Sequence, residues 1–193
     1  MDKNGLFDVI IVLGYPGSGK GTQCNKIEKE YNYHHISAGY LLQKETLNPQ
    51  MKYGEIIKSH RSKGTIVPHE ITCKLILQEM KSSQKSKKFV IDGFPRNEDN
   101  FIGWKSFLVK HCSLQCVLFI DCSEEVCRKR CLQRNRDSAD SVDVVDKRLK
   151  QFNDETRLVL QQFGVLVRKI NGNQDTNKVF EDIQLELERL LKK

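Results

Sequence analysis

Hydrophobic residues along the chain alternate between short continuous runs and longer stretches with helical spacing. Four runs have the length of buried strands: "DVIIVLG" at 8–14, "KKFVIDGF" at 87–94, "CVLFIDC" at 116–122 and "VLVRKI" at 165–170. A shorter extended segment, "HHIS" at 34–37, is the candidate for a fifth. Continuous apolar strands separated by helices are typical of a parallel sheet covered on both faces. The pattern therefore predicts an α/β fold with a five-stranded, doubly wound parallel sheet.

Three of the helical stretches also have recognisable ends. Pro68 opens "PHEITCKLILQEM", a position where its missing N–H is not needed. Ser123 precedes "EEVCRKRCLQR" as a cap, with acidic residues in the first turn. The last helix is expected from about Asp175, with one apolar face made of Val179, Ile183, Leu187 and Leu190.

Two polar segments interrupt this alternation. Residues 37–67 have helical pattern but no strand, so we expect a small subdomain that stands off the sheet. Residues 134–143, "RNRDSADSVD", separate two helices and are a candidate for a short mobile lid. With 193 residues in total, these segments are expected to be excursions from a single domain.

Composition narrows the class of protein further. Seven cysteines without a CxxC pair, and an N-terminus unlike a signal peptide, favour reduced thiols in a cytoplasmic protein, with the nucleus as a second location. Cys127 and Cys131 share a helix face, where burial is favoured over zinc binding. The net charge of +7 favours anionic partners, but the lysines are scattered. We therefore expect phosphorylated small molecules, and neither nucleic acid nor a membrane.

The strongest chemical signal is "VLGYPGSGKGTQ" at 12–23, which joins a strand to a helix. The spacing Gly14-x4-Gly19-Lys20 in this context is that of a phosphate-binding loop, in which backbone N–H groups and the lysine hold phosphates. One alternative is a plain glycine-rich turn between strand and helix. A dinucleotide-binding fold would need GxGxxG instead and would leave Lys20 without a role. A hydroxyl residue normally follows the lysine, but here Gly21 follows it and the hydroxyl belongs to Thr22.

This shifted hydroxyl resembles the loop of the nucleoside monophosphate kinase (adenylate kinase) family. Further stretches extend the resemblance over nearly the whole chain: "HISAGYLLQ", "GTIVPHEIT", "FVIDGFPRN", "RKRCLQR" and "DVVDKRL". "GFPRNEDNFIGW" and "DCSEEVCRKRCL" are most similar to the UMP-CMP kinase branch. The resemblance implies a P-loop three-layer α/β/α domain in which 37–67 binds the monophosphate and 134–143 is a short lid.

The resemblance also implies roles for particular residues. Transfer between two nucleotides gathers negative charge in one cleft, which arginines and Mg²⁺ neutralise. The catalytic cations are expected to be Lys20, Arg96, Arg134, Arg148 and, from the lid, Arg136. The ATP site is expected to contain Gly17, Ser18, Gly19, Lys20, Gly21, Thr22, Arg130, Arg134 and Gln174. The monophosphate site is expected to contain Ser37, Gln43, Thr65, Ile66, Val67, Gly93, Phe94, Pro95, Arg96, Asn97, Asn100 and Arg148. Asp92 and Thr22 are the expected Mg²⁺ residues.

Two positions depart from the family pattern. Gln43 stands where the family has an arginine on the acceptor phosphate, and Tyr40 replaces the usual acid beside it. Lys44 follows Gln43 but points about 100° away on a helix. In the lid, Asp137 occupies an arginine position, and Arg136 beside it is the candidate replacement. On this reading Gln43→Arg is expected to improve use of the acceptor.

Three functions remain open from the sequence. The favoured one is a kinase that uses ATP to phosphorylate CMP or UMP, because Asn97 and Asn100 replace the glutamine with which the adenylate kinase branch reads adenine. The second is an adenylate kinase. The third is a nucleotide-binding protein with weak or no phosphoryl transfer. Gln43 and Asp137 favour it, because each stands where the family has an arginine. We expect the protein to be a monomer.

Overall fold

The computed structural model describes residues 5–47, 52–83, 86–134 and 140–191. Its centre is a sheet of five parallel strands in the order β2-β3-β1-β4-β5. The strands are β1 (Phe7–Leu13), β2 (His34–Ser37), β3 (Lys88–Asp92), β4 (Cys112–Asp121) and β5 (Val167–Asn171). The predicted five-stranded α/β fold is confirmed, with "HHIS" as an edge strand.

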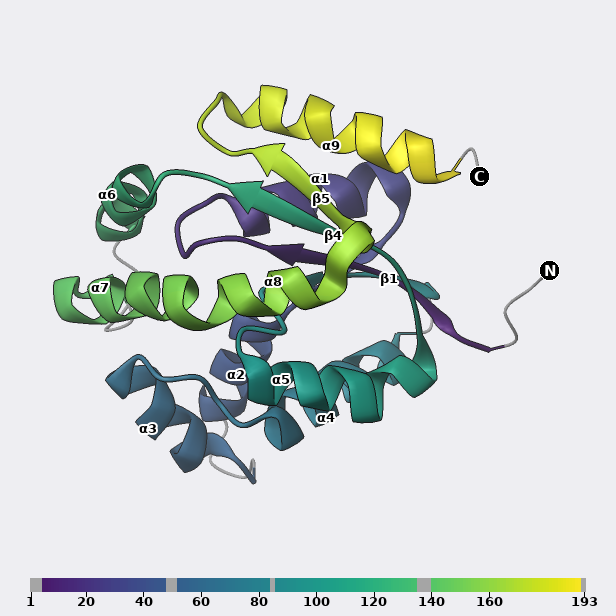
Figure 1. The fold of residues 1–193 in the computed structure, drawn as a ribbon. Helices are drawn as coiled ribbons and strands as arrows, with labels where there is room; N and C mark the ends of the chain where they lie inside the picture. The colour runs from purple at the N-terminus through teal and green to yellow at the C-terminus, as the bar shows by residue number, and fades with distance from the viewer. Residues whose placement is uncertain (1–4, 48–51, 84–85, 135–139, 192–193) are drawn as a thin grey trace.

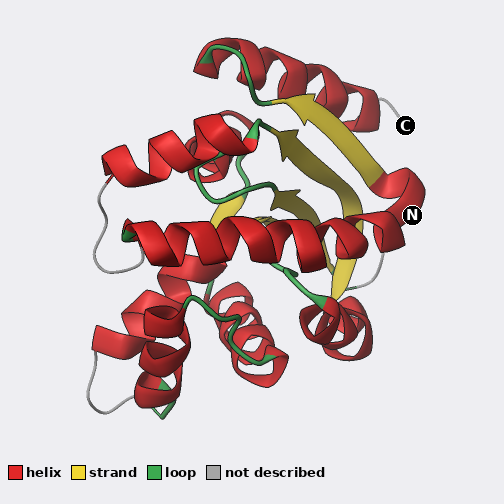
Figure 2. Ribbon diagram, turned by 60° about the vertical axis from the view of Figure 1, so that its left-hand side comes forward, coloured by secondary structure: helices red, strands yellow, loops and turns green. Residues whose placement is uncertain are grey.

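Helices cover both faces of this sheet (Figures 1 and 2). On one face α1 (Lys20–Tyr31) and α9 (Thr176–Leu191) enclose a core that includes Ile10, Ile27 and Ile183, all at most 1% exposed. Alternate residues of β1 point to opposite faces, so Ile10 belongs to this layer and its neighbour Ile11 to the other.

The opposite face carries further helices. These are α4 (His69–Ser82), α5 (Glu98–Gly103), α6 (Glu124–Arg134), α7 (Val142–Gln151) and α8 (Arg157–Phe163). A π turn, Trp104–Leu108, and a 3-10 turn, Val109–His111, extend α5. Another π turn, Phe152–Thr156, joins α7 to α8, and a 3-10 turn, Gly164–Leu166, precedes β5. The core beneath them includes Ile76, Trp104 and Val159.

Several predicted element starts differ from the structure. Strand β5 begins at Val167 and not at Val165, because residues 164–166 form a 3-10 turn. Strand β4 begins at Cys112, four residues before the predicted start, because the register shift opposite β1 leaves Gln115 as an extra residue. The Gln115 side chain donates to Asp8 Oδ1 at 3.0 Å. This polar residue interrupts the apolar pattern, so the sequence did not indicate the first residues of the strand. Pro68 is the residue before α4, with ψ of 145°, and not its first helical residue. Ser123 does precede α6, where its carbonyl accepts from the Cys127 N–H.

The segment 37–67 forms two helices away from the sheet, α2 (Ala38–Leu47) and α3 (Gly54–Lys63), at the lower left of Figure 1. Leu42, Ile57, Val67 and Ile71 form a small separate core that ties these helices to α4. Within the segment 134–143, residues 135–139 lie outside the described part, and so do Arg136 and Asp137.

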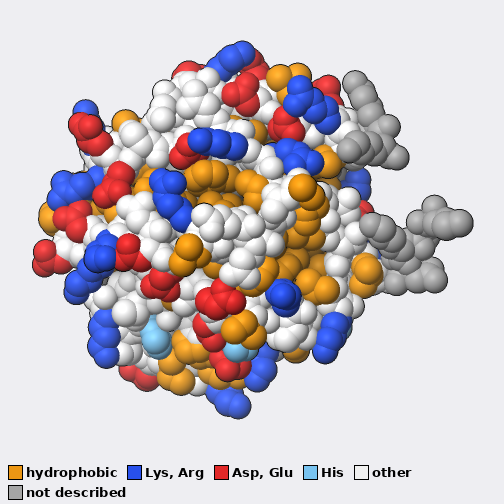
Figure 3. Space-filling model, viewed as in Figure 1, with side chains coloured by type: hydrophobic (Ala, Val, Ile, Leu, Met, Phe, Trp, Pro, Cys, Tyr) orange, Lys and Arg blue, Asp and Glu red, His pale blue; other side chains and the backbone are white. Residues whose placement is uncertain are grey.

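The face of the molecule shown in Figure 3 carries charges of both signs. On the face shown in Figure 3, Lys and Arg side chains are interspersed with Asp and Glu and form no continuous basic stripe. Among the described residues, no helix has the length and apolar character needed to cross a membrane.

Candidate active site

The glycine loop between β1 and α1 has the backbone that its sequence predicts. Gly17 and Gly19 have φ of 85° and 93°, which favour glycine. A Cβ on Gly17 would lie 2.2 Å from the Cys127 carbonyl oxygen of α6, so this glycine is required by space as well as by φ. The Ser18 N–H donates to the Tyr15 carbonyl at 3.1 Å and closes the turn. The loop therefore curls tightly against α6 and leads into the positive end of α1.

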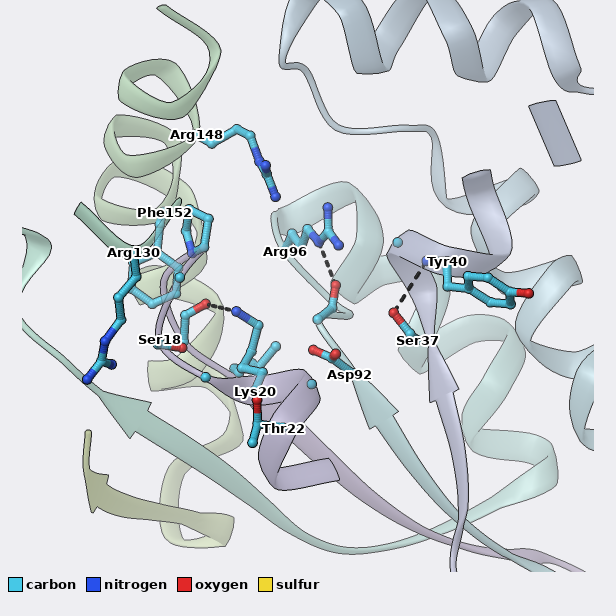
Figure 4. A pocket seen from close by; sticks show the side chains of 18 of the residues that line it. Ser18, Lys20, Thr22, Ser37, Tyr40, Asp92, Arg96, Arg130, Arg148 and Phe152 are labelled. Atoms are coloured by element: carbon cyan, nitrogen blue, oxygen red, sulfur yellow. Dashed lines mark hydrogen bonds between the residues drawn. The ribbon is translucent and has the colours of Figure 1, made fainter. Parts of the chain in front are cut away.

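Lys20 is the first residue of α1 and folds back over this loop (Figure 4). Its Nζ donates to the Gly14 carbonyl at 2.8 Å and to the Tyr15 carbonyl at 2.7 Å. Burial lowers the pKa of Lys20 from 10.5 to about 8, although the charge of Asp92 acts in the opposite direction. The desolvated ammonium is therefore held inside the site by the loop's own carbonyls.

Asp92 is the last residue of β3, at the carboxyl edge of the sheet. Burial alone raises the pKa of this carboxyl, but the neighbouring His35 and the Lys20 charge outweigh it, so the net pKa is lowered. Asp92 is therefore ionised at neutral pH. Cys24, His35 and Asp92 bring possible metal-ligand atoms within 4.8 Å of one another. Burial raises the pKa of Cys24 well above its ordinary value, so its thiol is protonated and a poor ligand.

Arg96 is held in place by one hydrogen bond from its side chain and one to its backbone carbonyl. Its Nε donates to the Gly93 carbonyl, and its own carbonyl accepts from Thr156 Oγ1 at 2.6 Å. Gly93 has φ of 75°, and a Cβ there would approach Arg96 Nη2 to 3.2 Å. Burial, followed by the charge of Arg148, lowers the pKa of Arg96 to about 10, so the guanidinium remains charged.

Asp140 holds two further arginines from different helices. Arg134, the last residue of α6, donates to its two carboxylate oxygens at 2.8 and 2.6 Å. Arg148 of α7 approaches the same carboxylate at 3.7 Å. The Asp140 carboxylate is fully buried. Arg148 points from α7 towards Arg96 across the site in Figure 4.

Three other predicted residues lie on the rim of the site. Arg130, one turn before Arg134 on α6, has Nη1 3.6 Å from the Cys122 sulfur. Gln174, between β5 and α9, donates its side-chain N–H to Asp182. Ser37 Oγ accepts from the Tyr40 N–H at 3.3 Å at the start of α2.

These groups surround one cavity of about 1040 Å³. The predicted residues that line it are Gly17, Ser18, Gly19, Lys20, Gly21, Thr22, Ser37, Gln43, Thr65, Ile66, Val67, Asp92, Gly93, Arg96, Arg130, Arg134, Arg148 and Gln174. Four predicted residues are not part of this lining: Phe94, Pro95, Asn97 and Asn100. Lys44 is exposed and lies outside the lining, as its helical position predicts.

The two asparagines have structural partners. Asn97 caps α5, where its side-chain oxygen accepts from the Asn100 N–H at 2.9 Å. Asn100 is 2% exposed and donates to the Val67 carbonyl at 3.3 Å. Asn100 thus fixes one end of the segment 65–67, whose residues line the cavity. Direct contact of either side chain with a base stays a prediction.

Sequence reasoning missed several lining residues, of which Arg61 on α3 carries a charge. One available signal was its spacing: Arg61 follows the fully buried Ile57 by four residues and shares its helix face. Gly172 was also missed, and a Cβ there would lie 2.9 Å from Ile120 and Cys122. His35 and Asp140 were not assigned a site role, because their function depends on the tertiary neighbours described above.

Comparison with known proteins agrees with this geometry. The family model described as "Adenylate kinase" matches residues 12–166. The chain is 40% identical over 184 residues to the UMP-CMP kinase of Bos taurus, covering 91% of this chain and 94% of that protein. It is 39% identical to the Homo sapiens UMP-CMP kinase with the same coverage. It is 40% identical over 182 residues to UMP-CMP kinase 2 of Caenorhabditis elegans, covering 93% and 95%. The chain belongs to the adenylate kinase family.

Proposed function

We propose that this protein transfers the γ-phosphoryl group of ATP to CMP or UMP, forming ADP and CDP or UDP. The observation that carries the proposal is a single cavity with a phosphate loop at one end and the α2–α3 subdomain at the other. Lys20, Arg96 and Arg148 reach into the same cavity from separate elements. Phosphoryl transfer needs two phosphate-bearing substrates to meet between cations, and this cavity provides such an arrangement.

The chain's own residues divide the work between donor and acceptor. The glycine loop and Lys20 hold the donor phosphates, and Arg96 holds the acceptor phosphate. Arg134 and Arg148 neutralise the charge on the group in transfer, as preorganised cations in a site shielded from water. Substrate phosphates compete with Asp140 for both arginines, so Asp140 keeps them positioned until the nucleotides bind.

The residues present fit a magnesium ion. Asp92 supplies an ionised carboxylate at the cavity wall, and Thr22 supplies a hydroxyl from the first turn of α1. Hard oxygen donors of this kind are the ligands that Mg²⁺ prefers. When bound, the ion neutralises the donor phosphates. Asp92 and Thr22 are the residues that would hold it.

A pyrimidine acceptor is supported by the relatives, which carry the name UMP-CMP kinase. Asn100 adds a local argument, because its short amide fixes the backbone of the segment 65–67 at the cavity wall. A site that hydrogen-bonds one base edge rejects another base strongly. CMP and UMP are therefore expected to exceed AMP as acceptors, and adenylate kinase activity is the alternative.

A panel of monophosphates tests the proposal. ADP formation from ATP is measured with CMP, UMP, dCMP, AMP and GMP, using Lys20→Met protein from the same purification as the control for contaminating kinases. The highest kcat/KM is expected with CMP or UMP. The highest value with AMP assigns adenylate kinase activity instead. ATP binding without transfer to any acceptor assigns a nucleotide-binding protein without catalysis.

A further inference from the structure

A third guanidinium faces the acceptor end of the cavity beside Arg96 and Arg148. Arg61 lies in the last turn of α3, and its Nη1 approaches the Gly39 carbonyl at 3.4 Å. Gly39 also lies close to Arg96, since a Cβ built on Gly39 would lie 3.7 Å from Arg96 Nη2. Arg61 and Arg96 therefore both approach the same glycine at the start of α2.

The packing of α3 turns Arg61, and not its basic neighbours, towards the cavity. Arg61 follows Ile57 by one turn, and Ile57 is completely buried in the small core of the subdomain. Lys58 and Lys63 are exposed, and Lys58 pairs with Glu55 at 2.7 Å. An arginine could complement the negative end of α3 from an exposed position. That role therefore does not explain why Arg61 points towards the cavity.

The charges around Arg61 are arranged for an anion. Its positive charge contributes to lowering the pKa of both Arg96 and Arg148, after the larger effect of burial on each. Three guanidiniums that repel one another across a cavity are stabilised together when a doubly charged phosphate enters between them. Gln43, on the same wall, supplies only a neutral amide.

We propose that Arg61 binds the phosphate of the acceptor monophosphate together with Arg96, and supplies the cation that position 43 lacks. This inference rests on the proposed function and adds a specific acceptor-binding residue to it. It also changes what is expected of Gln43→Arg. A second arginine at position 43 has little to add while Arg61 is present, and compensates when Arg61 is absent.

The test compares Arg61→Gln with Lys63→Gln, which removes the same charge from an exposed position in the same helical turn. KM for CMP is measured at saturating ATP and KM for ATP at saturating CMP. Loss of a charge-assisted contact predicts a rise of about tenfold or more in KM for CMP in Arg61→Gln, with KM for ATP within about twofold. Lys63→Gln is expected to match the wild type in both constants.

Two further measurements separate ligand binding from a structural role. Calorimetry of CMP against cytidine is expected to show that Arg61→Gln weakens CMP binding and leaves cytidine binding unchanged. The double variant Arg61→Gln/Gln43→Arg is expected to recover most of the lost affinity for CMP. Equal constants in Arg61→Gln and Lys63→Gln overturn the proposal, as does equal weakening of CMP and cytidine. Failure of the wild type to use any monophosphate overturns the proposed function itself, which is a distinguishable result.

Discussion

Replacing Lys20 by methionine is expected to abolish transfer and, at the same time, to change how stability depends on pH. Lys20 is a buried ammonium that donates to the backbone carbonyls of Gly14 and Tyr15 and lies near the charge of Asp92. Methionine has similar length and no charge. Loss of one preorganised electrostatic contact predicts a fall in kcat of at least ~10²-fold.

The magnitude of the stability effect follows from the lowered pKa. Lys20 titrates near 8 in the folded protein and at its ordinary 10.5 in the unfolded chain. At 1.36 kcal/mol per pH unit, its charge costs the folded state roughly 3 kcal/mol below pH 8. Between pH 8 and 10.5 the unfolded chain binds more protons, so this cost disappears as the pH rises. The wild type therefore gains stability relative to Lys20→Met over this range.

Urea unfolding of both proteins at several values between pH 7 and 10 measures this difference. The exposed Lys29→Met, on the same helix, is the matched control and is expected to follow the wild type. Other titrating groups are shared by all three proteins and cancel in the comparison. A difference between wild type and Lys20→Met that does not vary with pH would show that the Lys20 ammonium is not desolvated. Near-normal turnover in Lys20→Met would refute the phosphate-loop assignment.

Two other predictions concern the metal and the moving parts. Asp92→Asn is expected to raise the Mg²⁺ concentration needed for half-maximal turnover by about tenfold or more, with metal-free ATP binding little changed; an unaltered Mg²⁺ titration would remove Asp92 from the metal site. The segments 37–67 and 134–143 are expected to close over two bound nucleotides, because closure keeps water from the triphosphate. Amide hydrogen exchange in both segments should therefore slow when a two-substrate analogue binds. Equal exchange rates in the free and bound states would contradict closure.

The fold was predictable because each of its layers leaves a local pattern in the sequence. Buried parallel strands are continuous apolar runs, and glycine spacing marks a turn that only glycine can adopt, as Gly17 shows with both its φ and its contact with α6. The start of β4 was not predictable, because the extra Gln115 is tolerated through its bond to Asp8 on the neighbouring strand. That partner is 107 residues away in the sequence, so no local window contains the reason.

The site was predictable where the motif itself positions the residue, as for Lys20 and Asp92. It was not predictable where a side chain reaches the cavity through packing between elements. Arg61 enters because Ile57 anchors its helix face, and Asp140 matters because α6 and α7 bring two arginines to one carboxylate. Asn100 also has a partner that its motif does not indicate, because its side chain donates to the Val67 carbonyl.

The charge of the cavity connects composition with function. Among the described lining residues, the cations are Lys20, Arg61, Arg96, Arg130, Arg134 and Arg148, whereas the acids are Asp92 and Asp140. Most of these cations come from elements far apart in the sequence, so the linear charge pattern looks scattered although the folded charge is concentrated. Burial and mutual repulsion make this cluster of cations unfavourable, as the lowered pKa values of Lys20 and Arg96 indicate. We expect bound phosphates to relieve that repulsion, so that the groups which destabilise the fold supply free energy for holding two nucleotides together.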